Sequence, residues 1–162
     1  ATDMVSDGSA AYNIMGDWAV AEFDSRNKTF GKDYTAFALP GKEDVYGFLA
    51  DSFTLPTGTK KPEATKDWLG FVGSKDAQST FNQIKGSIPA RTDVSPDGFN
   101  AYQQKAMKDF KEKKIVSSIA HGAAVPLAWS SEINTAMSKF HQDKNTDNFV
   151  SALVAAHDKY AM

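Results

Sequence analysis

The sequence predicts a helix-rich α/β chain in which two or three short strands come first and about five helices follow. Short apolar runs bounded by turn residues dominate the first third of the chain, and apolar residues at helical spacing dominate the rest. The composition, 41% apolar and 23% charged over 162 residues, is that of a globular protein.

The strands are predicted from three apolar segments. Ala10–Met15 is typical of a short buried strand, and Tyr34–Leu39 alternates between apolar and polar residues before it is closed by Pro40-Gly41. Val45–Leu55 is a third apolar run, and it contains a single charge, Asp51. A carboxylate inside an apolar run is costly unless it is paired or faces a cleft, so Asp51 is a candidate functional residue.

The first helices are predicted from their end signals. Gly16-Asp17 is expected to form a turn or N-cap, so that a helix starts at Trp18 and continues to Phe23. Pro62 suits the first position of a helix that runs to about Val72. Ser74 is expected to cap a short helix through Ile84.

Three further helices follow from apolar periodicity. Phe99, Tyr102, Ala106 and Phe110 keep helical spacing up to the Lys111–Lys114 segment, whose cations suit a helix C-terminus. Pro126 is expected to open a helix that reaches Phe140, and Asn145-Thr146-Asp147 to cap a last one.

The small number of strands predicts that the chain is a part of a larger protein. Two or three strands cannot form an independent sheet with helices on both faces. We therefore expect the remaining strands to lie upstream of Ala1. Produced alone, the chain should associate with the missing N-terminal half of the same protein or with itself through a vacant sheet edge.

Composition and motifs argue against several functions. The net charge is −2 and the 18 basic residues are dispersed, so we expect no nucleic-acid partner. No segment approaches the roughly 20 apolar residues that span a bilayer. The chain has no Cys and three scattered His, so we expect neither a metal nor another cofactor. No nucleophile elbow, phosphate loop or dinucleotide fingerprint is present, and we do not expect an enzyme.

Five segments, in the same order and at compatible separations, resemble the second half of family-1 extracellular solute-binding proteins. They are AAYNIMGDWA, YTAFALPG, GFLADSFTLPTGTKKPEATKDWLGFV, FNQIKGSIPAR and SIAHGAAVP. The closest likeness is to the glucose/mannose-type monosaccharide-binding proteins of bacterial ABC importers. The resemblance covers about Asp7 to about Tyr160.

The resemblance implies a part of the two-lobed periplasmic-binding-protein fold, with the sugar in a cleft between lobes. Residues 1–39 would belong to the C-terminal lobe and end in a hinge strand, 44–86 to the N-terminal lobe, and 95–162 to the helices of the C-terminal lobe. The implied partners are a monosaccharide, the membrane subunits of an ABC importer and the missing N-terminal half. The implied location is periplasmic, or extracytoplasmic and lipid-anchored in a Gram-positive host.

The resemblance also implies four sugar-binding residues: Trp18, Asp51, Lys85 and His121. A hexose presents hydroxyls at its rim and C–H groups on its faces, so a site needs polar donors and acceptors together with an aromatic plate. Trp18 would border the sugar ring, Asp51 would accept from hydroxyls, and Lys85 would donate. His121 completes the set.

Each of these residues also has a purely structural interpretation. Trp18 is a candidate core anchor, Asp51 a turn residue, Lys85 a solvated cation and His121 a buried histidine. Arg91 is a weaker candidate ligand or else a structural ion-pair partner. Asp17 is interpreted as an N-cap rather than as a ligand.

Two other functions remain open from the sequence. In a carbohydrate-active enzyme, Asp51 would pair with a second carboxylate, for which Asp17, Glu22 and Glu132 are the nearest options. In an interaction module, the helical C-terminal region would dock on the importer's membrane subunits. Sugar capture ranks above both.

Overall fold

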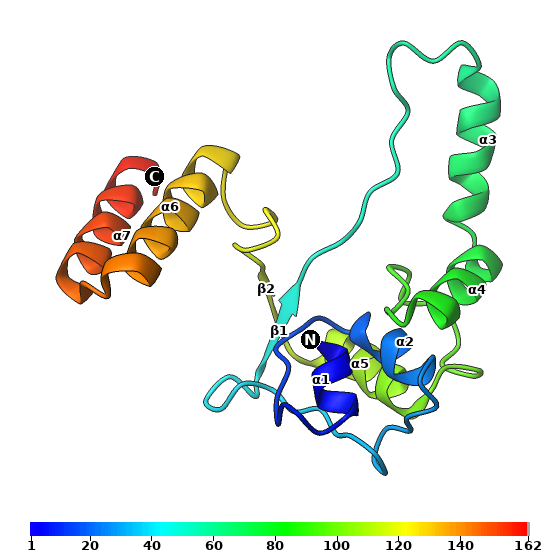
Figure 1. Ribbon diagram of the computed structural model, residues 1–162. Coiled ribbons are helices and arrows are strands. Elements are labelled where there is room, and N and C mark those ends of the chain that lie inside the picture. Colours follow the sequence, from blue (N-terminus) through cyan, green and yellow to red (C-terminus); the bar gives the residue numbers. More distant parts are fainter. Residues whose placement is uncertain (162) are drawn as a thin grey trace. The chain divides into compact units, whose positions relative to one another are not determined.

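The computed structural model describes residues 1–161 and divides into two compact units. The first unit comprises Ala1–Tyr46 and Asp51–Lys114, and the second comprises Gly47–Ala50 and the residues from Ile115 on. Figure 1 shows the elements in chain order. They are α1 (Thr2–Ser6), α2 (Ala19–Asp24), β1 (Val45–Phe48), α3 (Pro62–Val72), α4 (Lys75–Lys85), α5 (Ala101–Glu112), β2 (Lys114–Ser117), α6 (Leu127–Asp143) and α7 (Thr146–Tyr160).

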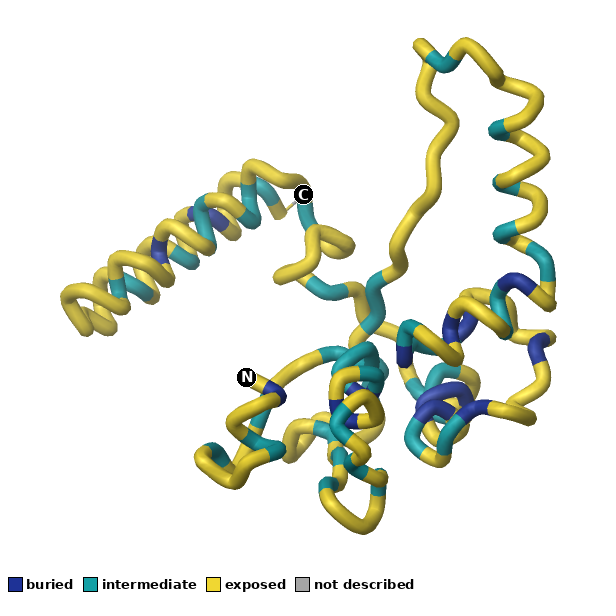
Figure 2. Tube along the Cα trace, turned by 45° about the vertical axis from the view of Figure 1, so that its right-hand side comes forward, coloured by how far each residue is buried: buried dark blue, intermediate teal, exposed yellow. Residues whose placement is uncertain are grey.

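The first unit is built around α5. Val94, Phe99 and Met107 form its buried apolar cluster, and Ile88 packs against them. In Figure 2 the buried residues of this unit gather around α2, α4 and α5, whereas the connection from β1 to α3 is almost entirely exposed. The core therefore lies next to the end of α4.

Aromatic rings extend this core toward the N-terminal segment. Phe23 of α2 stacks on Tyr34 with ring centroids 4.1 Å apart. Phe30 meets both Tyr34 and Tyr102 edge to face, at 5.7 and 5.5 Å. These contacts tie the chain between α2 and β1 to α5, and each adds about 0.5–1.5 kcal/mol to simple burial.

The predicted helix signals of α3 and α4 are confirmed. Pro62 occupies the first turn of α3, where its missing N–H costs no hydrogen bond. The Ser74 side chain accepts a 3.3 Å hydrogen bond from the Ala77 N–H and so caps α4. Gly86 ends α4 in the left-handed conformation.

The second unit is dominated by an α6–α7 helical pair. Pro126 is the N-cap residue of α6, and the Asn145 side chain accepts from the Asn148 N–H at 3.0 Å to cap α7. Phe140 stacks on Phe149 at 4.9 Å, close to the turn between the helices. The predicted helix starts at Pro126 and Asn145 are confirmed.

The two strands form a small parallel sheet. The Lys114 N–H donates to the Asp44 carbonyl at 3.1 Å, and the Ser118 N–H donates to the Phe48 carbonyl at 2.9 Å. Both residue numbers increase together along the pair, so the strands run in the same direction. β2 was not predicted: α5 ends at Glu112, and Lys114 starts a strand instead of belonging to a helix end.

The strands predicted over 10–15 and 34–39 are not observed. Both segments are extended, but among residues 1–161 neither has a partner strand. Tyr34 makes only an isolated bridge to Phe30. Burial still alternates along 34–39, as it does in a strand. A strand needs a hydrogen-bonded neighbour, and apolar alternation alone does not supply one. The fold class is nevertheless confirmed, as a helix-rich α/β chain with two strands.

No helix within residues 1–161 is long and apolar enough to cross a membrane. The division into lobe segments 1–39, 44–86 and 95–162 stays a prediction. Compact units defined by contacts within this chain do not test it.

Candidate functional site

Lys85 lies at the C-terminal end of α4, and the glycine after it turns the chain sharply. Gly86 has φ +84°, a conformation that residues with a side chain rarely adopt. Its N–H donates to the Asn82 carbonyl at 3.0 Å and closes the helix. The chain direction therefore changes directly after Lys85.

Gly86 also lets the chain approach α2 closely. A Cβ at this position would lie 2.7 Å from the Ala21 nitrogen, 2.9 Å from the Ala21 Cβ and 3.2 Å from the Trp18 carbonyl oxygen. Only glycine fits such a contact without displacing backbone. Two predicted site residues, Trp18 and Lys85, are thereby brought to the same region of the first unit.

Lys85 and Asp51 form an ion pair. The Lys85 Nζ contacts Asp51 Oδ2, although 34 residues separate the two in sequence. The Asp51 side chain is 66% exposed and that of Lys85 33%. The pair therefore faces solvent on one side. The surface position of this pair makes its own contribution to stability small, about 0–1 kcal/mol.

Trp18 is half-buried at the start of α2. Its indole ring lies across Gly16, where a Cβ would stand 2.2 Å from the ring. Glycine at 16 therefore allows the ring to fold back over the preceding chain. Trp18 is neither a fully buried core anchor nor a solvated side chain, which leaves part of its surface available to a ligand.

Asp17 has a tertiary partner rather than the predicted N-cap role. Trp18 is the N-cap residue of α2, and no side chain caps this helix. The Asp17 carboxylate instead accepts a 3.2 Å hydrogen bond from the Ile88 N–H. Burial raises the pKa of Asp17, while the Ile88 N–H and the nearby Lys85 cation act in the opposite direction. The N-cap interpretation was wrong because the carboxylate is used by a segment 71 residues away.

An aromatic cluster adjoins Lys85. The Lys85 Nζ lies 5.7 Å from the centre of the Phe81 ring. Phe81 and Trp68 both meet Phe53 edge to face, at 6.3 and 5.1 Å. Phe53, Trp68 and Phe81 are each between 44% and 49% exposed, so the Lys85 cation borders an accessible apolar surface.

His121 belongs to the second unit. Its Nδ1 lies 2.8 Å from the Ser118 Oγ, and its N–H donates to the same oxygen at 3.4 Å. The turn is tightened by the Gly122 N–H, which donates to the Ile119 carbonyl at 3.1 Å. The side chain is exposed and ordered by Ser118, and its part in a sugar site stays a prediction.

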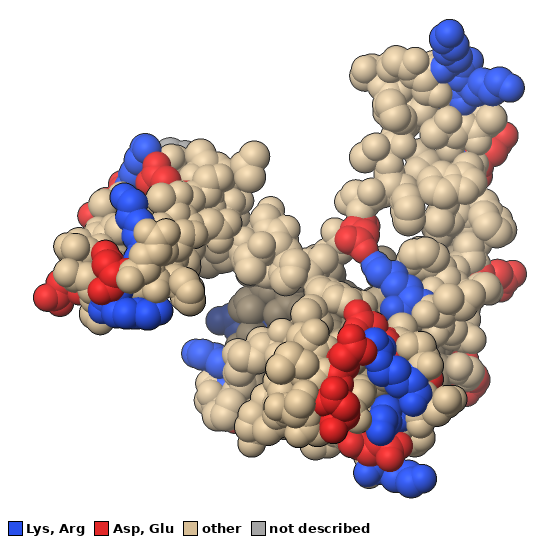
Figure 3. Space-filling view, viewed as in Figure 1, with Lys and Arg blue, Asp and Glu red and all other residues tan. Residues whose placement is uncertain are grey.

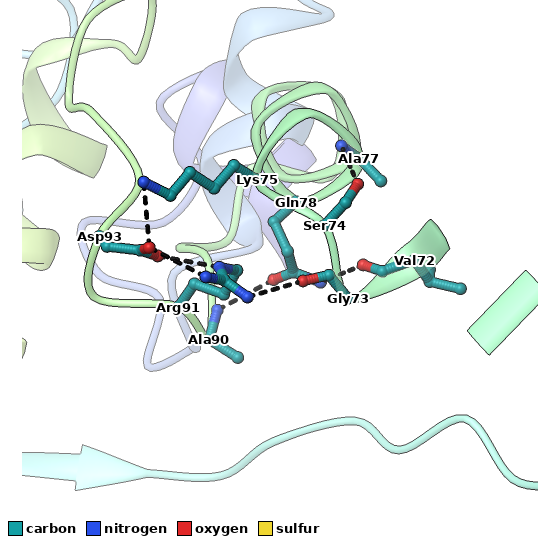
Figure 4. Close-up of polar contacts among 9 residues, drawn as sticks. All are labelled: Val72, Gly73, Ser74, Lys75, Ala77, Gln78, Ala90, Arg91 and Asp93. Carbon is teal, nitrogen blue, oxygen red and sulfur yellow. Dashed lines mark hydrogen bonds and ion pairs between the residues drawn. The ribbon is translucent and has the colours of Figure 1, made fainter. Parts of the chain in front are cut away.

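Arg91 is a structural ion-pair residue in the arrangement of Figure 4. Its Nε and terminal nitrogen bind the two oxygens of Asp93 at 2.8 and 2.9 Å, and it also donates to the Gly73 carbonyl at 3.1 Å. Lys75 reaches the same carboxylate at 3.1 Å. The hydrogen bonds from Arg91, and after them the one from Lys75, hold the pKa of Asp93 well below its usual range. This cluster fastens the junction of α3 and α4.

Two buried polar residues next to the site were missed from the sequence. Asn82 and Gln103 are 5% and 2% exposed, and both bind the chain that follows Lys85. The available signal was Gln103 itself, a polar residue on the face of α5 that also carries Ala106 and Met107. Its spacing from Asn100 is that of a capping box, which the structure contains.

An open, mostly apolar pocket of about 970 Å³ in the first unit borders α2 and residues 16–17. Segments 10–17 and 33–40, the two unpaired extended stretches, line most of it. Tyr12 and Phe37 meet across it edge to face at 6.3 Å. Its lining includes the polar residues Asn13, Asp17, Asp33 and Thr35 but no Lys or Arg. Asp51 and Lys85 place a donor beside an acceptor, so this pair remains the better candidate site.

The charge pattern suits a neutral, polar ligand. On the face of the first unit seen in Figure 3, acidic and basic residues lie side by side rather than as a field of one sign. Within the described part of the chain, no three His, Asp or Glu side chains are grouped as metal ligands would be. Paired donors and acceptors beside aromatic rings can bind hydroxyl groups and C–H faces without any ion.

Comparison with known proteins identifies the chain's relatives. Residues 1–111 match the family described as bacterial extracellular solute-binding protein. An uncharacterized ABC transporter extracellular-binding protein of Pyrococcus horikoshii is 37% identical over 96% of this chain and 35% of its own length. A probable sugar-binding periplasmic protein of Brucella suis is 35% identical over 96% of this chain and 38% of its own. The xylose/arabinose-binding protein of Haloferax volcanii is 35% identical over 94% of this chain and 34% of its own length.

The chain thus spans between about a third and two fifths of the length of these relatives. The similarity covers nearly all of the present sequence. The resemblance predicted from the five sequence segments is confirmed at the level of the family.

Proposed function

Because this chain belongs to the family of bacterial extracellular solute-binding proteins, we propose that the protein binds a monosaccharide, glucose or a close epimer, and delivers it unchanged to an ABC importer. The observation that carries the proposal is the solvent-facing Asp51–Lys85 pair, with Trp18 positioned nearby through the contact of Gly86 with α2. Membership of an extracellular family makes this an extracytoplasmic protein.

The pair suits a sugar rim chemically. A hydroxyl group donates one hydrogen bond and accepts others, so it can lie between a carboxylate and an ammonium group and satisfy both. Asp51 would accept from one hydroxyl and Lys85 would donate to the same or the next oxygen. The half-buried Trp18 ring offers an apolar surface to the C–H face of the sugar.

The names of the relatives support a sugar as the ligand, and we narrow this class to glucose or a close epimer. The Brucella suis protein is named a probable sugar-binding protein, and the Haloferax volcanii protein is named for xylose and arabinose. Either a hexose or a pentose is consistent with those names. Our proposal of glucose or a close epimer follows the likeness of the Trp18, Asp51, Lys85 and His121 set to glucose/mannose-type binding proteins.

The partner is proposed to be the membrane part of an ABC importer, and no catalysis is proposed. A transport receptor must release its sugar unchanged, whereas an enzyme must bind the transition state better than the substrate. Asp51 is already paired with a cation, which suits hydroxyl recognition better than a glycosidase pair of two carboxylates. A sugar incubated with the protein should be recovered intact.

Calorimetry on the full-length protein tests the proposal. We expect one hexose to bind more tightly than pentoses and disaccharides. If the sugar and closure of the cleft bury the ion pair, Asp51→Ala and Lys85→Ala should each weaken binding by about 2–5 kcal/mol. If the pair remained at the surface, the loss would be about 1 kcal/mol or less.

The matched control is Glu63→Ala, which removes an exposed carboxylate from the Glu63–Lys66 pair on α3. It should leave sugar affinity unchanged. Wild-type affinity in both the Asp51 and the Lys85 variant would show that these residues do not bind the sugar. Tight binding of only a peptide or an amino acid would refute the sugar proposal as a whole.

A further inference from the structure

Gln103 is the most deeply buried polar side chain near Lys85, and it lies on a different helix. It is 2% exposed on α5. Its Nε2 donates to the Asn82 carbonyl at 2.8 Å and to the Ser87 carbonyl at 2.9 Å. One carbonyl belongs to the last turn of α4 and the other to the loop that follows Lys85. A single amide group therefore joins both sides of Lys85 to α5.

The hydrogen bonds of this side chain are complete. Both Nε2 hydrogens are used, and the Oε1 accepts from the Asn100 N–H at 3.3 Å. The Asn100 side chain in return accepts from the Gln103 N–H at 2.9 Å, which fixes the amide to the start of α5. A buried polar group with all partners in place has one orientation, because any other leaves donors unpaired.

The loop after Lys85 is held at three consecutive residues. Gly86 packs directly on Ala21 of α2. The Ser87 Oγ donates to the Asn82 side-chain oxygen at 2.7 Å, and the Ile88 N–H donates to Asp17 at 3.2 Å. With the bond from Gln103 to the Ser87 carbonyl, the backbone that carries Lys85 is anchored to both α2 and α5.

We propose that Gln103 is a positioning residue of the sugar site, which keeps Lys85 within ion-pairing distance of Asp51 without touching the sugar. The proposal rests on the proposed function of Lys85. The Lys85 ammonium group meets Asp51 and lies over the Phe81 ring, and both contacts depend on where the backbone at the end of α4 places the side chain. Gln103 binds that backbone on both sides of Lys85. Losing the anchor at Ser87 would let the loop move and would separate the ammonium group from the sugar position.

The test uses Gln103→Met in the full-length protein. Methionine keeps the length of the side chain and removes both donors. The control is Gln104→Met, the same change at the next residue of α5, where the Nε2 donates to the Phe99 carbonyl at 2.8 Å, outside the Lys85 loop. We expect hydrogen exchange of the Ile88 N–H to become about tenfold faster in Gln103→Met and to stay unchanged in Gln104→Met.

The second measurement is glucose affinity on folded protein. Gln103→Met should weaken binding roughly tenfold and Gln104→Met should not change it. In a Lys85→Ala background, Gln103→Met should add no further loss, since the residue acts through Lys85. If Gln103→Met does not fold, Ser87→Ala, which removes only the loop hydroxyl, should shift both measurements in the same direction by a smaller factor.

Unchanged Ile88 exchange in Gln103→Met would overturn the proposal. Unchanged glucose affinity in Gln103→Met would also overturn it. An equal loss of affinity in the wild-type and Lys85→Ala backgrounds would do the same, because it would indicate a general structural role for Gln103. If the wild-type protein binds no sugar, the proposed function fails. The exchange measurement then decides by itself whether Gln103 holds the loop.

Discussion

Replacing Gly86 by alanine should remove the contact that joins the end of α4 to α2. The magnitude follows from two separate costs. A residue with a side chain at φ +84° pays roughly 1–2 kcal/mol for the left-handed conformation. The new Cβ would also stand 2.7 Å from the Ala21 nitrogen and 2.9 Å from its Cβ, and relieving such an overlap costs about 1–3 kcal/mol. The free energy of unfolding should therefore fall by about 2–5 kcal/mol, a large fraction of typical stability.

Urea unfolding followed by tryptophan fluorescence measures this loss. The control is Gly31→Ala, since Gly31 has φ +82° but a Cβ there would have no atom within 4 Å. Gly31→Ala should show the conformational cost alone, and the difference between the two variants gives the cost of the approach to α2. If Gly86→Ala is no more destabilising than Gly31→Ala, the close packing of the Lys85 loop on α2 is not what holds this region.

Two further predictions concern stability. Burial raises the pKa of Asp17, so the folded state disfavours its ionised form, and the contribution of Asp17 to the free energy of unfolding rises as the pH falls through that raised pKa. Asp17→Asn keeps an oxygen for the Ile88 N–H but removes the charge. The free energy of unfolding of this variant, relative to that of wild type, should be greater at pH 7 than at pH 4. A difference that does not change with pH would contradict the raised pKa of Asp17. Ser74→Ala removes the side-chain cap of α4 and should lower the free energy of unfolding by about 1 kcal/mol in the same urea assay, whereas an unchanged midpoint would mean that the cap contributes nothing.

The helices were predictable because their signals are local. Pro62, Ser74, Pro126 and Asn145 each act within one turn of the helix that they start, so neighbouring residues are sufficient to locate them. The strands were predicted less well for the opposite reason. An extended segment becomes a strand only when another segment pairs with it, and 10–15 finds no such partner among the described residues.

The candidate site was only partly predictable. Asp51 was identified because it interrupts an apolar run, and Lys85 through the family resemblance, but nothing local shows that the two side chains meet. Asp17 was assigned a role within its own helix, whereas the structure uses it to bind Ile88. Gln103 resembled any polar residue of a helix until its burial and its two carbonyl partners were seen.

By itself, the sequence determined the helix-rich α/β class, the starts of four helices and the family to which the chain belongs, because these depend on residue order and short-range geometry. Only the tertiary structure decided which distant groups share a site. It paired Asp51 with Lys85, brought Gly86 against α2 and placed the Gln103 amide between α4 and the loop that follows. The physical reason is that each of these contacts joins residues that are distant in sequence and meet only when the chain packs, and a buried amide such as that of Gln103 must then find its partners among them.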